Sequence, residues 1–472
     1  MNFNSVVFLF CFMPLALGLY YLVPGRVKNA VLLVESLLFF CWGGITWLPL
    51  AVGMVAINYA AGLLLASLPA GGKRKIVLIA AIVLTAAALV YCKYTNFLLD
   101  TLNVIASTGF AKLSFLDVLP LGISYYTFKL ISYTADVYTG KVKAERSPVV
   151  FAVYVLMYPQ LIVGPIVKYR DMADVLHQTQ GRCTLQKAQD GAEMFVFGLA
   201  KKVILADSIA ALWQDIIGTG GIGLANASLP LAWLGIIAYS LQLYFDFAGY
   251  SEMSNGLSLM MGFECPANFN LPYISGSITE FWRRWHISLS TWFREYVYIP
   301  LGGNRKGKGR QLVNIAIVWL LTGLWHGASW NFVLWGVYYA VLLLLEKTFL
   351  LKWLDKAPRF VGHVYTCLCF VLGWVLFAIT DFSALGAYLG HMFSGAFADG
   401  TTAYLLRCDW LVLALAVVGC TSLPRRLWEK RERAMTPALS DGLRMVWVAV
   451  VLLVSIAFLV GDSYNPFLYF RF

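Results

Sequence analysis

Hydrophobic positions form long runs along this chain, separated by short polar connections. A run of about 18 apolar residues is long enough to cross the hydrocarbon core of a bilayer as a helix. Only helices and closed barrels satisfy all their backbone groups in lipid, and the alternation expected of barrel strands is absent. The pattern therefore predicts an all-α polytopic membrane protein. The apolar runs are residues 3–23, 45–68, 76–92, 311–345, 360–380 and 443–461.

The central part of the chain is patterned differently from its two ends. Residues 1–140 are predicted to form a compact set of about five spans with short connections. Residues 140–310 contain short apolar stretches interrupted by Pro, Gly and charged residues, and residues 311–472 return to long clean spans, with 346–472 as the C-terminal set. Broken helices at membrane depth are tolerated only where protein or a cavity surrounds them. We expect one integral membrane domain whose central part, 141–345, holds a tunnel and the catalytic core.

The charge distribution predicts the topology. The net charge of +11 comes from Lys and Arg in short connections, a positive-inside signal rather than the footprint of a nucleic-acid binder. The first three clusters follow one, three and five predicted spans, which places them in the cytoplasm and both termini outside it. Residues 3–23 lack a basic n-region and a cleavage site, so we expect a retained helix. The basic clusters are residues 26–28, 71–75, 141–146, 305–310 and 425–433.

Cysteine usage points to no special chemistry. The nine Cys residues are scattered, mostly within apolar stretches, and no C-x-x-C pair occurs. Buried cysteines of this kind behave as small hydrophobic side chains. We expect no disulfide framework and no metal site.

A segment rich in Trp and Arg, FWRRWHISLSTWFREYVYIPLGGNR at residues 281–305, stands out in this apolar chain. Ser277 and Glu280 have capping-box spacing, and Glu280 can reach Arg283 or Arg284 along a helix. The segment predicts one amphipathic helix that ends near Pro300. Its bulky stripe comprises Trp282, Trp285, Leu289 and Trp292.

His286 lies off that stripe, one turn before Ser290. Trp and Arg suit the membrane interface, so composition leaves two interpretations open. The segment is either an interfacial anchor with an incidental histidine or part of a site.

His326 is the most unusual ionisable residue of the chain. No Lys, Arg, Asp or Glu occurs between Arg310 and Glu346, and an ionisable side chain in such a run is by default a functional candidate. Burial disfavours the imidazolium, and a neutral imidazole is what a general base needs. The alternative is a neutral core histidine bonded to a backbone carbonyl. Gly323 and Gly327 would let a ligand or another backbone approach closely.

The remaining ionisable groups are easier to explain. His177, His363 and His391 are predicted to be ordinary surface or interface residues. Asp246, in YFDFAGYSEM at 244–253, is expected to pair with an Arg at 283, 284 or 294, since a lone buried carboxylate is costly. A purely structural ion pair is the alternative there. No G-x-S-x-G and no H-x-x-x-H motif occurs, so the chemistry indicated is activation of a substrate hydroxyl rather than a covalent intermediate on this chain.

Several of these motifs together resemble the membrane-bound O-acyltransferase (MBOAT) family. They look most similar to its bacterial branch, which includes the membrane subunit of alginate O-acetylation and the teichoic-acid D-alanyl transferase. The resemblance covers essentially the whole chain. The motifs that carry it are the 281–305 segment, GLWHGASWNFVLWG at 323–336, YPQLIVGPIVKY at 158–169, YFDFAGYSEM at 244–253 and NPFLYFRF at 465–472.

The resemblance implies roughly 10–12 transmembrane or re-entrant helices around a tunnel open to both membrane faces. It implies that His326 is the catalytic histidine and His286 the second polar residue of the active site. Acetyl-coenzyme A is then the donor substrate from the cytoplasm, with no permanently bound cofactor. The further residues expected along the tunnel are Trp282, Arg283, Trp285, Ser290, Tyr244, Asp246, Trp325 and Asn331.

Location and partners also follow from the resemblance. We expect a multi-pass protein of the bacterial inner membrane that acts with an extracytoplasmic SGNH-hydrolase-like partner on a polysaccharide acceptor. Membrane lipids surround it, and the basic residues 305–310 contact coenzyme phosphates or anionic lipid headgroups, or only set the topology. D-alanyl transfer to teichoic acid is the alternative within the family. A secondary transporter with Asp246, His286 and His326 as a proton relay is the alternative outside it, and a non-enzymatic scaffold would leave His326 unexplained.

Overall fold

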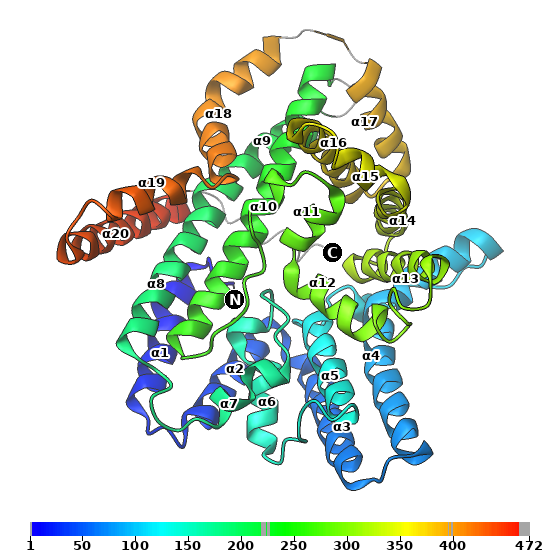
Figure 1. Ribbon diagram of the computed structural model, residues 1–472, viewed down its shortest axis with the longest axis vertical. Helices are drawn as coiled ribbons and strands as arrows, with labels where there is room; N and C mark the ends of the chain where they lie inside the picture. Colours follow the sequence, from blue (N-terminus) through cyan, green and yellow to red (C-terminus); the bar gives the residue numbers. More distant parts are fainter. Residues whose placement is uncertain (1, 219–222, 224–226, 395, 398–399, 462–472) are drawn as a thin grey trace. The chain divides into compact units, whose positions relative to one another are not determined.

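Every regular element that the structure describes is a helix, which confirms the all-α prediction (Figure 1). The computed structural model describes residues 2–218, 223, 227–394, 396–397 and 400–461. The prediction that the C-terminal residues 464–472 lie outside the cell falls on residues beyond that description. The described chain divides into two compact units. Unit 1 comprises residues 1–195, 251–267 and 291–297, and unit 2 comprises residues 196–250, 268–290 and 298–472.

Unit 1 contains the N-terminal helices. Within residues 1–140, the stretches Lys28–Ser67 and Gly72–Ala106 are long and apolar enough to cross a membrane, and Phe8–Leu22 is a shorter apolar helix. Basic residues follow α1, α3 and α5, as the sequence pattern requires. The helices are η1 (Phe8–Phe12), α1 (Met13–Leu22), α2 (Lys28–Gly44), η2 (Ile45–Trp47), α3 (Leu48–Ser67), α4 (Gly72–Ala106), η3 (Ser114–Leu116), α5 (Ile123–Tyr138), α6 (Pro148–Leu156), η4 (Tyr158–Gln160), α7 (Tyr169–His177) and most of α8 (Leu185–Ala200).

A buried amide joins three helices of unit 1. Asn58 of α3 donates from Nδ2 to Thr85 Oγ1 of α4 at 2.8 Å, and its Oδ1 accepts from Thr134 Oγ1 of α5 at 2.9 Å. All three side chains are buried. Hydrogen bonds of this kind hold apolar helices together where the hydrophobic effect between helices is weak.

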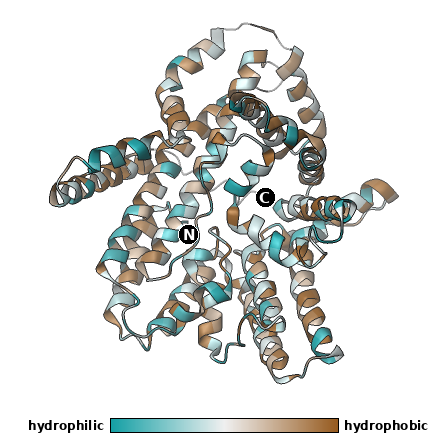
Figure 2. Cartoon of the chain, in the orientation of Figure 1, coloured by the Kyte–Doolittle hydropathy of each residue, from teal (hydrophilic) through white to brown (hydrophobic). Residues whose placement is uncertain are grey.

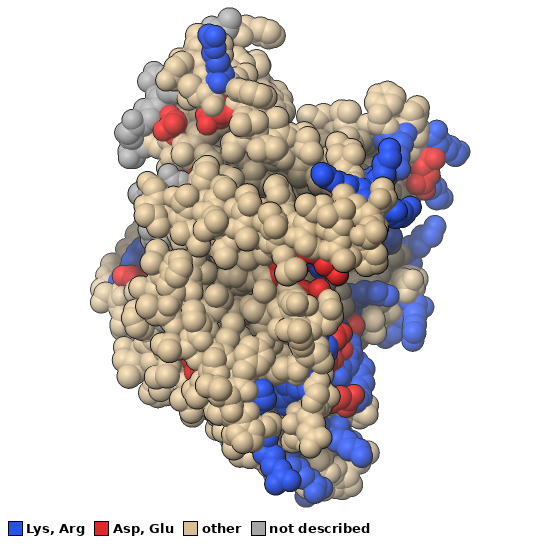
Figure 3. All heavy atoms as spheres, turned by 90° about the vertical axis from the view of Figure 1, so that its left-hand side faces the viewer, with Lys and Arg blue, Asp and Glu red and all other residues tan. Residues whose placement is uncertain are grey.

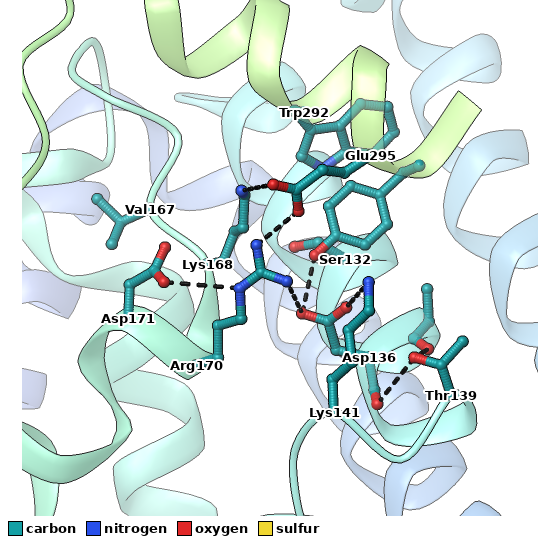
Figure 4. A network of polar contacts seen from close by, with 12 residues as sticks. Ser132, Asp136, Thr139, Lys141, Val167, Lys168, Arg170, Asp171, Trp292 and Glu295 are labelled. Atoms are coloured by element: carbon teal, nitrogen blue, oxygen red, sulfur yellow. Dashed lines mark hydrogen bonds and ion pairs between the residues drawn. The ribbon is translucent and has the colours of Figure 1, made fainter. Parts of the chain in front are cut away.

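A second polar cluster of unit 1 ties α5 and α7 to the π-helix η8 (Arg294–Tyr298), as Figure 4 shows. Glu295 pairs with Lys168 Nζ at 2.8 Å and with Arg170. The buried Asp136 accepts from Tyr296 Oη at 2.8 Å. Partial burial raises the pKa of Glu295, but hydrogen bonds and charges from Lys168 and Arg170 outweigh it and hold that pKa below its ordinary value.

Unit 2 contains the unusual segments singled out in the sequence. Four helical elements, α8, α10, α12 and η8, contribute residues to both units. The elements are η5 (Lys201–Asp207), α9 (Ser208–Ile217), α10 (Leu229–Met260), η7 (Pro272–Ile274), α11 (Ile278–Arg284), α12 (Ile287–Phe293), α13 (Lys308–His326), α14 (Trp330–Leu345), η9 (Glu346–Leu350), α15 (Leu351–Leu354), α16 (Arg359–Ala378), α17 (Phe382–Ser394), α18 (Gly400–Gly419), α19 (Leu423–Glu432) and α20 (Pro437–Gly461).

Seven helical stretches of the described chain are long and apolar enough to cross a membrane. Figure 2 shows apolar colour over most of their length, and Figure 3 shows a broad uncharged face with Lys and Arg in a few clusters. The apolar window of α20 is only 11% buried, whereas that of α10 is 89% buried. A helix surrounded by protein tolerates Gln242, Asp246 and Asn255, which is why the sequence pattern did not show α10 as a clean span.

The apolar run at 311–345 is two helices rather than one, because the chain breaks between His326 and Trp330. α13 and α14 then pack with their backbones in close approach at Gly323 and Gly336. A Cβ at Gly323 would lie 2.4 Å from the carbonyl oxygen of Phe332 and 3.0 Å from Gly336 Cα. The expectation that Gly323 admits another backbone is confirmed.

Substitution of Gly323 by Ala should therefore destabilise the protein. The added methyl group meets backbone atoms that cannot move aside, and overpacking of this kind costs about 1–3 kcal/mol. We expect the apparent melting temperature in detergent to fall by several degrees for Gly323→Ala. The matched control is Gly309→Ala on the same helix, where a Cβ meets nothing within 4 Å. Equal melting temperatures for the two variants would contradict the close helix crossing.

Candidate active site

The segment around His286 is broken into two helical pieces, α11 and the continuous run of α12 and η8, so the prediction of one continuous helix is wrong. α11 ends at Arg284, α12 begins at Ile287, and the π-helix η8 ends at Tyr298, close to the predicted end near Pro300. The break falls at His286, whose φ of 44° lies in the left-handed region. Residues with a Cβ rarely adopt this conformation, and the strain costs on the order of 1–3 kcal/mol. Such strain is characteristic of functional sites.

Residues 268–270 hold the break in place. The Ile287 N–H donates to the Asn268 carbonyl at 2.9 Å, and the Asn270 N–H donates to the Arg284 carbonyl at 2.9 Å. The side chain of Asn268 places its Oδ1 3.1 Å from His286 Nδ1. The His286 side chain lies outside the seven candidate spans and is 1% exposed. Burial lowers the pKa of His286 well below its ordinary value, so the imidazole is neutral near pH 7.

The start of α11 confirms part of the local prediction. The Glu280 N–H donates to Ser277 Oγ at 3.1 Å, as the capping-box spacing requires. The Glu280 carboxylate pairs with Arg284, whose Nε lies 2.9 Å from its Oε1.

Sequence reasoning missed the strongest anchor of α11, which is the buried carboxylate of Glu346. It accepts hydrogen bonds from the Ile278 and Thr279 N–H groups, both at 2.7 Å. A carboxylate at a helix N-terminus satisfies unpaired N–H groups and interacts favourably with the helix dipole. Glu346 and α11 are far apart in the chain, so no local pattern could reveal this contact.

His326 is the last residue of α13 and is 4% exposed. Aromatic rings surround its imidazole: the ring centroid lies 4.9 Å from that of Trp335 and 5.4 Å from that of Phe377, both edge to face. A Cβ at the neighbouring Gly327 would overlap the Phe332 ring. His326 therefore lies inside protein rather than against lipid.

The two histidines border the same indole. The Trp325 ring centroid lies 5.9 Å from that of His286 and 5.0 Å from that of His326. Trp335 extends the cluster, because its ring also contacts Trp282 at 5.5 Å. The tertiary structure thus brings together two histidines separated by 40 positions, within a wall of tryptophans.

Several buried polar atoms of this cluster have no hydrogen-bond partner among the described residues. They include one histidine nitrogen, two indole nitrogens and one amide oxygen. Buried polar groups in proteins are nearly always paired, so an unpaired set in one place favours a site that binds a polar ligand. The atoms are His286 Nε2, Trp282 Nε1, Trp335 Nε1 and Asn331 Oδ1.

The other predicted site residues have varied surroundings. The Trp285 ring is tilted against that of Trp374 with centroids 4.9 Å apart, and the Tyr244 ring lies 6.2 Å from that of Trp285. Ser290 donates to the Trp282 carbonyl at 3.1 Å. Asn331 donates to the Leu376 carbonyl at the end of α16 at 3.1 Å, which gives it a structural contact. Arg283 is exposed.

Asp246 pairs with Lys202 and not with an Arg of the 281–305 segment, which corrects the expected partner. Lys202 Nζ lies 2.8 Å from Asp246 Oδ1 and 2.6 Å from Asp207 Oδ1. Lys202 and Asp207 belong to the π-helix η5, whose i to i+5 repeat brings these two positions together. Asp246 is adjacent to Phe247, whose ring lies 4.8 Å from the His286 ring, edge to face.

Two further features lie apart from this cluster. In the described residues, no group of three His, Cys, Asp or Glu side chains could hold a metal ion. A cavity of about 160 Å³ lies between α19 and α20, lined among others by Trp428, Arg431 and Trp447, and it includes none of the predicted site residues.

Buried histidines bordered by tryptophans are suited to proton transfer with water excluded. The fold is that of a polytopic helical membrane protein, and two buried histidines lie close together within it. The model of the membrane-bound O-acyltransferase family (MBOAT) matches residues 142–389, which include all ten predicted site residues. The chain belongs to this family and is an O-acyltransferase.

Relatives of known name extend the comparison over the full length. A probable alginate O-acetylase, AlgI, of Pseudomonas putida is 40% identical, and the alignment covers 100% of both chains. A peptidoglycan O-acetyltransferase of Helicobacter pylori is 29% identical over 100% of this chain and 97% of the relative. A teichoic acid D-alanyltransferase of Bacillus subtilis is 33% identical over 52% of this chain and 64% of the relative.

Removal of Lys202 should destabilise unit 2. Lys202→Met removes the buried cation that pairs with Asp246 and Asp207, and breaking a buried pair on one side costs about 3–5 kcal/mol. We expect a fall of many degrees in the apparent melting temperature in detergent. Because Asp246→Asn removes one of the two carboxylates that Lys202 neutralises, the double variant Lys202→Met/Asp246→Asn should recover part of the loss. If the destabilisation of the double variant equals the sum of the losses of the two single variants, a direct ion pair between Lys202 and Asp246 is contradicted.

Proposed function

We propose that the protein moves an acetyl group from cytoplasmic acetyl-coenzyme A to a hydroxyl on the extracytoplasmic side of the membrane. The observation that carries this proposal is the pair of buried histidines, His286 and His326, that border the Trp325 ring in an O-acyltransferase of the MBOAT family. The acetyl group is favoured because relatives named as O-acetylases align over the whole chain.

The proposed acceptor is an exopolysaccharide such as alginate. The support is that five relatives aligned over 84–100% of this chain carry the name probable alginate O-acetylase. The acetyl group reaches the sugar directly or by way of an extracytoplasmic SGNH-hydrolase-like partner. In both routes the immediate acceptor is an alcohol.

In the proposed mechanism, His326 is the general base. Its neutral imidazole takes the proton of the acceptor hydroxyl while that oxygen attacks the thioester carbonyl carbon. The tetrahedral intermediate collapses with cleavage of the carbon–sulfur bond, and the thiolate takes the proton from the imidazolium. The products are the O-acetyl ester and free coenzyme A thiol, and His326 is neutral again. A positioned base of this kind contributes roughly 10²–10⁴ in rate.

The other residues of the cluster prepare this step. His286 orients the acceptor, and the tryptophans at 282, 285 and 325 exclude water that would hydrolyse the thioester. Trp285 and Trp325 are 1% and 7% exposed, which suits a wall rather than a surface.

A tunnel that opens to both faces would let the acetyl group change sides while the charged coenzyme stays in the cytoplasm. The basic connections after α1, α3 and α5 then lie in the cytoplasm and both termini lie outside it, in the inner membrane of a bacterium.

D-alanyl transfer is the second candidate within the family. It is supported by a teichoic acid D-alanyltransferase that is 33% identical, although the match covers only 52% of this chain. A D-alanyl donor would be a carrier-protein thioester instead of acetyl-coenzyme A. Full-length similarity to O-acetylases favours acetyl transfer.

The His326→Ala protein should lose acetyl transfer. Loss of a general base lowers the rate by about 10² or more, so purified protein in lipid nanodiscs should transfer radiolabelled acetyl from acetyl-coenzyme A to oligomannuronate at least 100-fold more slowly than the wild type. The matched control is His391→Ala, a histidine of α17 outside the cluster, which should keep full activity. Normal transfer by a folded His326→Ala protein would remove His326 from the mechanism.

The donor is tested in the same nanodiscs. We expect acetyl-coenzyme A to support transfer and a D-alanyl carrier-protein thioester to support none. The opposite result would replace the acetyl proposal by D-alanyl transfer and leave the role of His326 in place.

A further inference from the structure

The amide of Asn268 has a defined orientation. Its Oδ1 accepts from the Ser288 N–H at 3.3 Å and from Ser288 Oγ at 2.9 Å. A backbone N–H is only a donor, so the Asn268 atom that faces it is the oxygen and not the NH₂ group. Asn268 is 3% exposed, and its amide is therefore held within the protein.

This orientation assigns the hydrogen of the His286 ring. The same Oδ1 lies 3.1 Å from His286 Nδ1, and an amide oxygen only accepts, so Nδ1 carries the hydrogen. A neutral imidazole has one N–H and one lone pair. The lone pair is therefore on Nε2, which is buried and has no hydrogen-bond partner among the described residues.

We infer that Asn268 is a positioning residue that holds His286 in the Nδ1–H tautomer, so that Nε2 accepts a hydrogen bond from a hydroxyl of the acceptor. This inference rests on the proposed function and narrows it. A neutral ring with a bare Nε2 has no hydrogen to offer an oxyanion, so the role left to His286 is to orient the acceptor. Since the reacting hydroxyl gives its proton to His326, His286 binds a second hydroxyl. The acceptor class is thus a sugar with neighbouring hydroxyls.

The surroundings of the ring reinforce the assignment. The side chains packed on His286 are Phe247 of α10, at 4.8 Å, and Trp325 of α13, at 5.9 Å. Neither titrates, and the hydrogen-bonding partner on its other side, Asn268, is also uncharged. The left-handed backbone of His286 costs conformational free energy. Its retention is consistent with a ring that must contact both Asn268 and a ligand.

The tautomer can be measured without any assay of activity. Protein labelled with ¹⁵N-histidine and reconstituted in lipid is examined by solid-state NMR, and the His286 signals are identified by their loss in His286→Gln. We expect a protonated Nδ1 and an unprotonated Nε2 in the wild type. We expect a mixture of tautomers in Asn268→Ala. A protonated Nε2 in the wild type would overturn the inference whatever the enzyme transfers.

Kinetics then test the positioning role. Asn268→Ala should raise the KM for the oligosaccharide acceptor about tenfold, the size expected for a lost hydrogen bond, and leave the KM for acetyl-coenzyme A unchanged. The control is Asn270→Ala in the same segment, which is exposed and should behave as the wild type. If Asn268→Ala melts early, binding of acetyl-coenzyme A shows whether the protein is still folded.

The variant Asn268→Asp separates positioning from mere packing. A carboxylate keeps the acceptor oxygen at Nδ1 but favours the imidazolium, so protonation of Nε2 begins at higher pH. We expect acetyl transfer to persist at alkaline pH. The pH below which the transfer rate falls should rise by about one unit or more. Two results together would contradict the positioning role: an unchanged acid side of the pH–rate profile in Asn268→Asp, and an unchanged acceptor KM in Asn268→Ala. Asn268 would then contribute only to packing. If neither the wild type nor any variant transfers acetyl to the oligosaccharide, alone or with the extracytoplasmic partner present, the proposed function fails while the NMR result still decides the tautomer.

Discussion

Desolvation of polar groups is the constraint on which this structure depends. Within an apolar helical protein every buried donor and acceptor needs a partner, because an unpaired one costs free energy comparable to a lost hydrogen bond. Asn58 meets this requirement with two threonines, Lys202 with two aspartates and Glu346 with two N–H groups. Four buried atoms of the histidine–tryptophan cluster have no partner among the described residues, namely His286 Nε2, Trp282 Nε1, Trp335 Nε1 and Asn331 Oδ1, and further buried atoms without one occur elsewhere in the described chain. In this cluster they lie beside two histidines that border the same indole, and this combination favours a site for a polar ligand.

A broken helix makes this site possible. The interruption at His286 separates α11 from α12 and places the histidine, with a left-handed backbone, directly before Ile287, where α12 begins. Two long-range contacts support the break: Glu346 binds the start of α11, and residues 268–270 bracket its end. Such a conformation is stable only because surrounding structure determines it. The break leaves an imidazole whose Nδ1 lies 3.1 Å from Asn268 Oδ1 and whose Nε2 has no hydrogen-bond partner among the described residues.

Several tryptophan side chains line the site. Trp282, Trp325 and Trp335 fill space around the histidines with large rigid rings, and close helix crossings at glycine allow the rings to meet. Large aromatic surfaces exclude water and lower the local polarity, and burial of this kind lowers the pKa of His286. The same residues would anchor a helix at the membrane interface if they faced lipid. Their burial, rather than their identity, separates the two interpretations of the 281–305 segment.

Much of the architecture could be predicted from the sequence because it follows from local periodicity. Apolar run lengths and the order of basic clusters predicted a polytopic helical protein, and the isolation of His326 among apolar residues identified it as a candidate. The break at His286, the partner of Asp246 and the roles of Asn268 and Glu346 could not be predicted, because they depend on contacts between distant positions. Helical spacing even favoured the wrong outcome, a continuous helix with one tryptophan stripe. A strained backbone such as that of His286 and the pairing of buried polar groups depend on tertiary contacts. At this site those contacts outweigh the local preference of the sequence for a continuous helix.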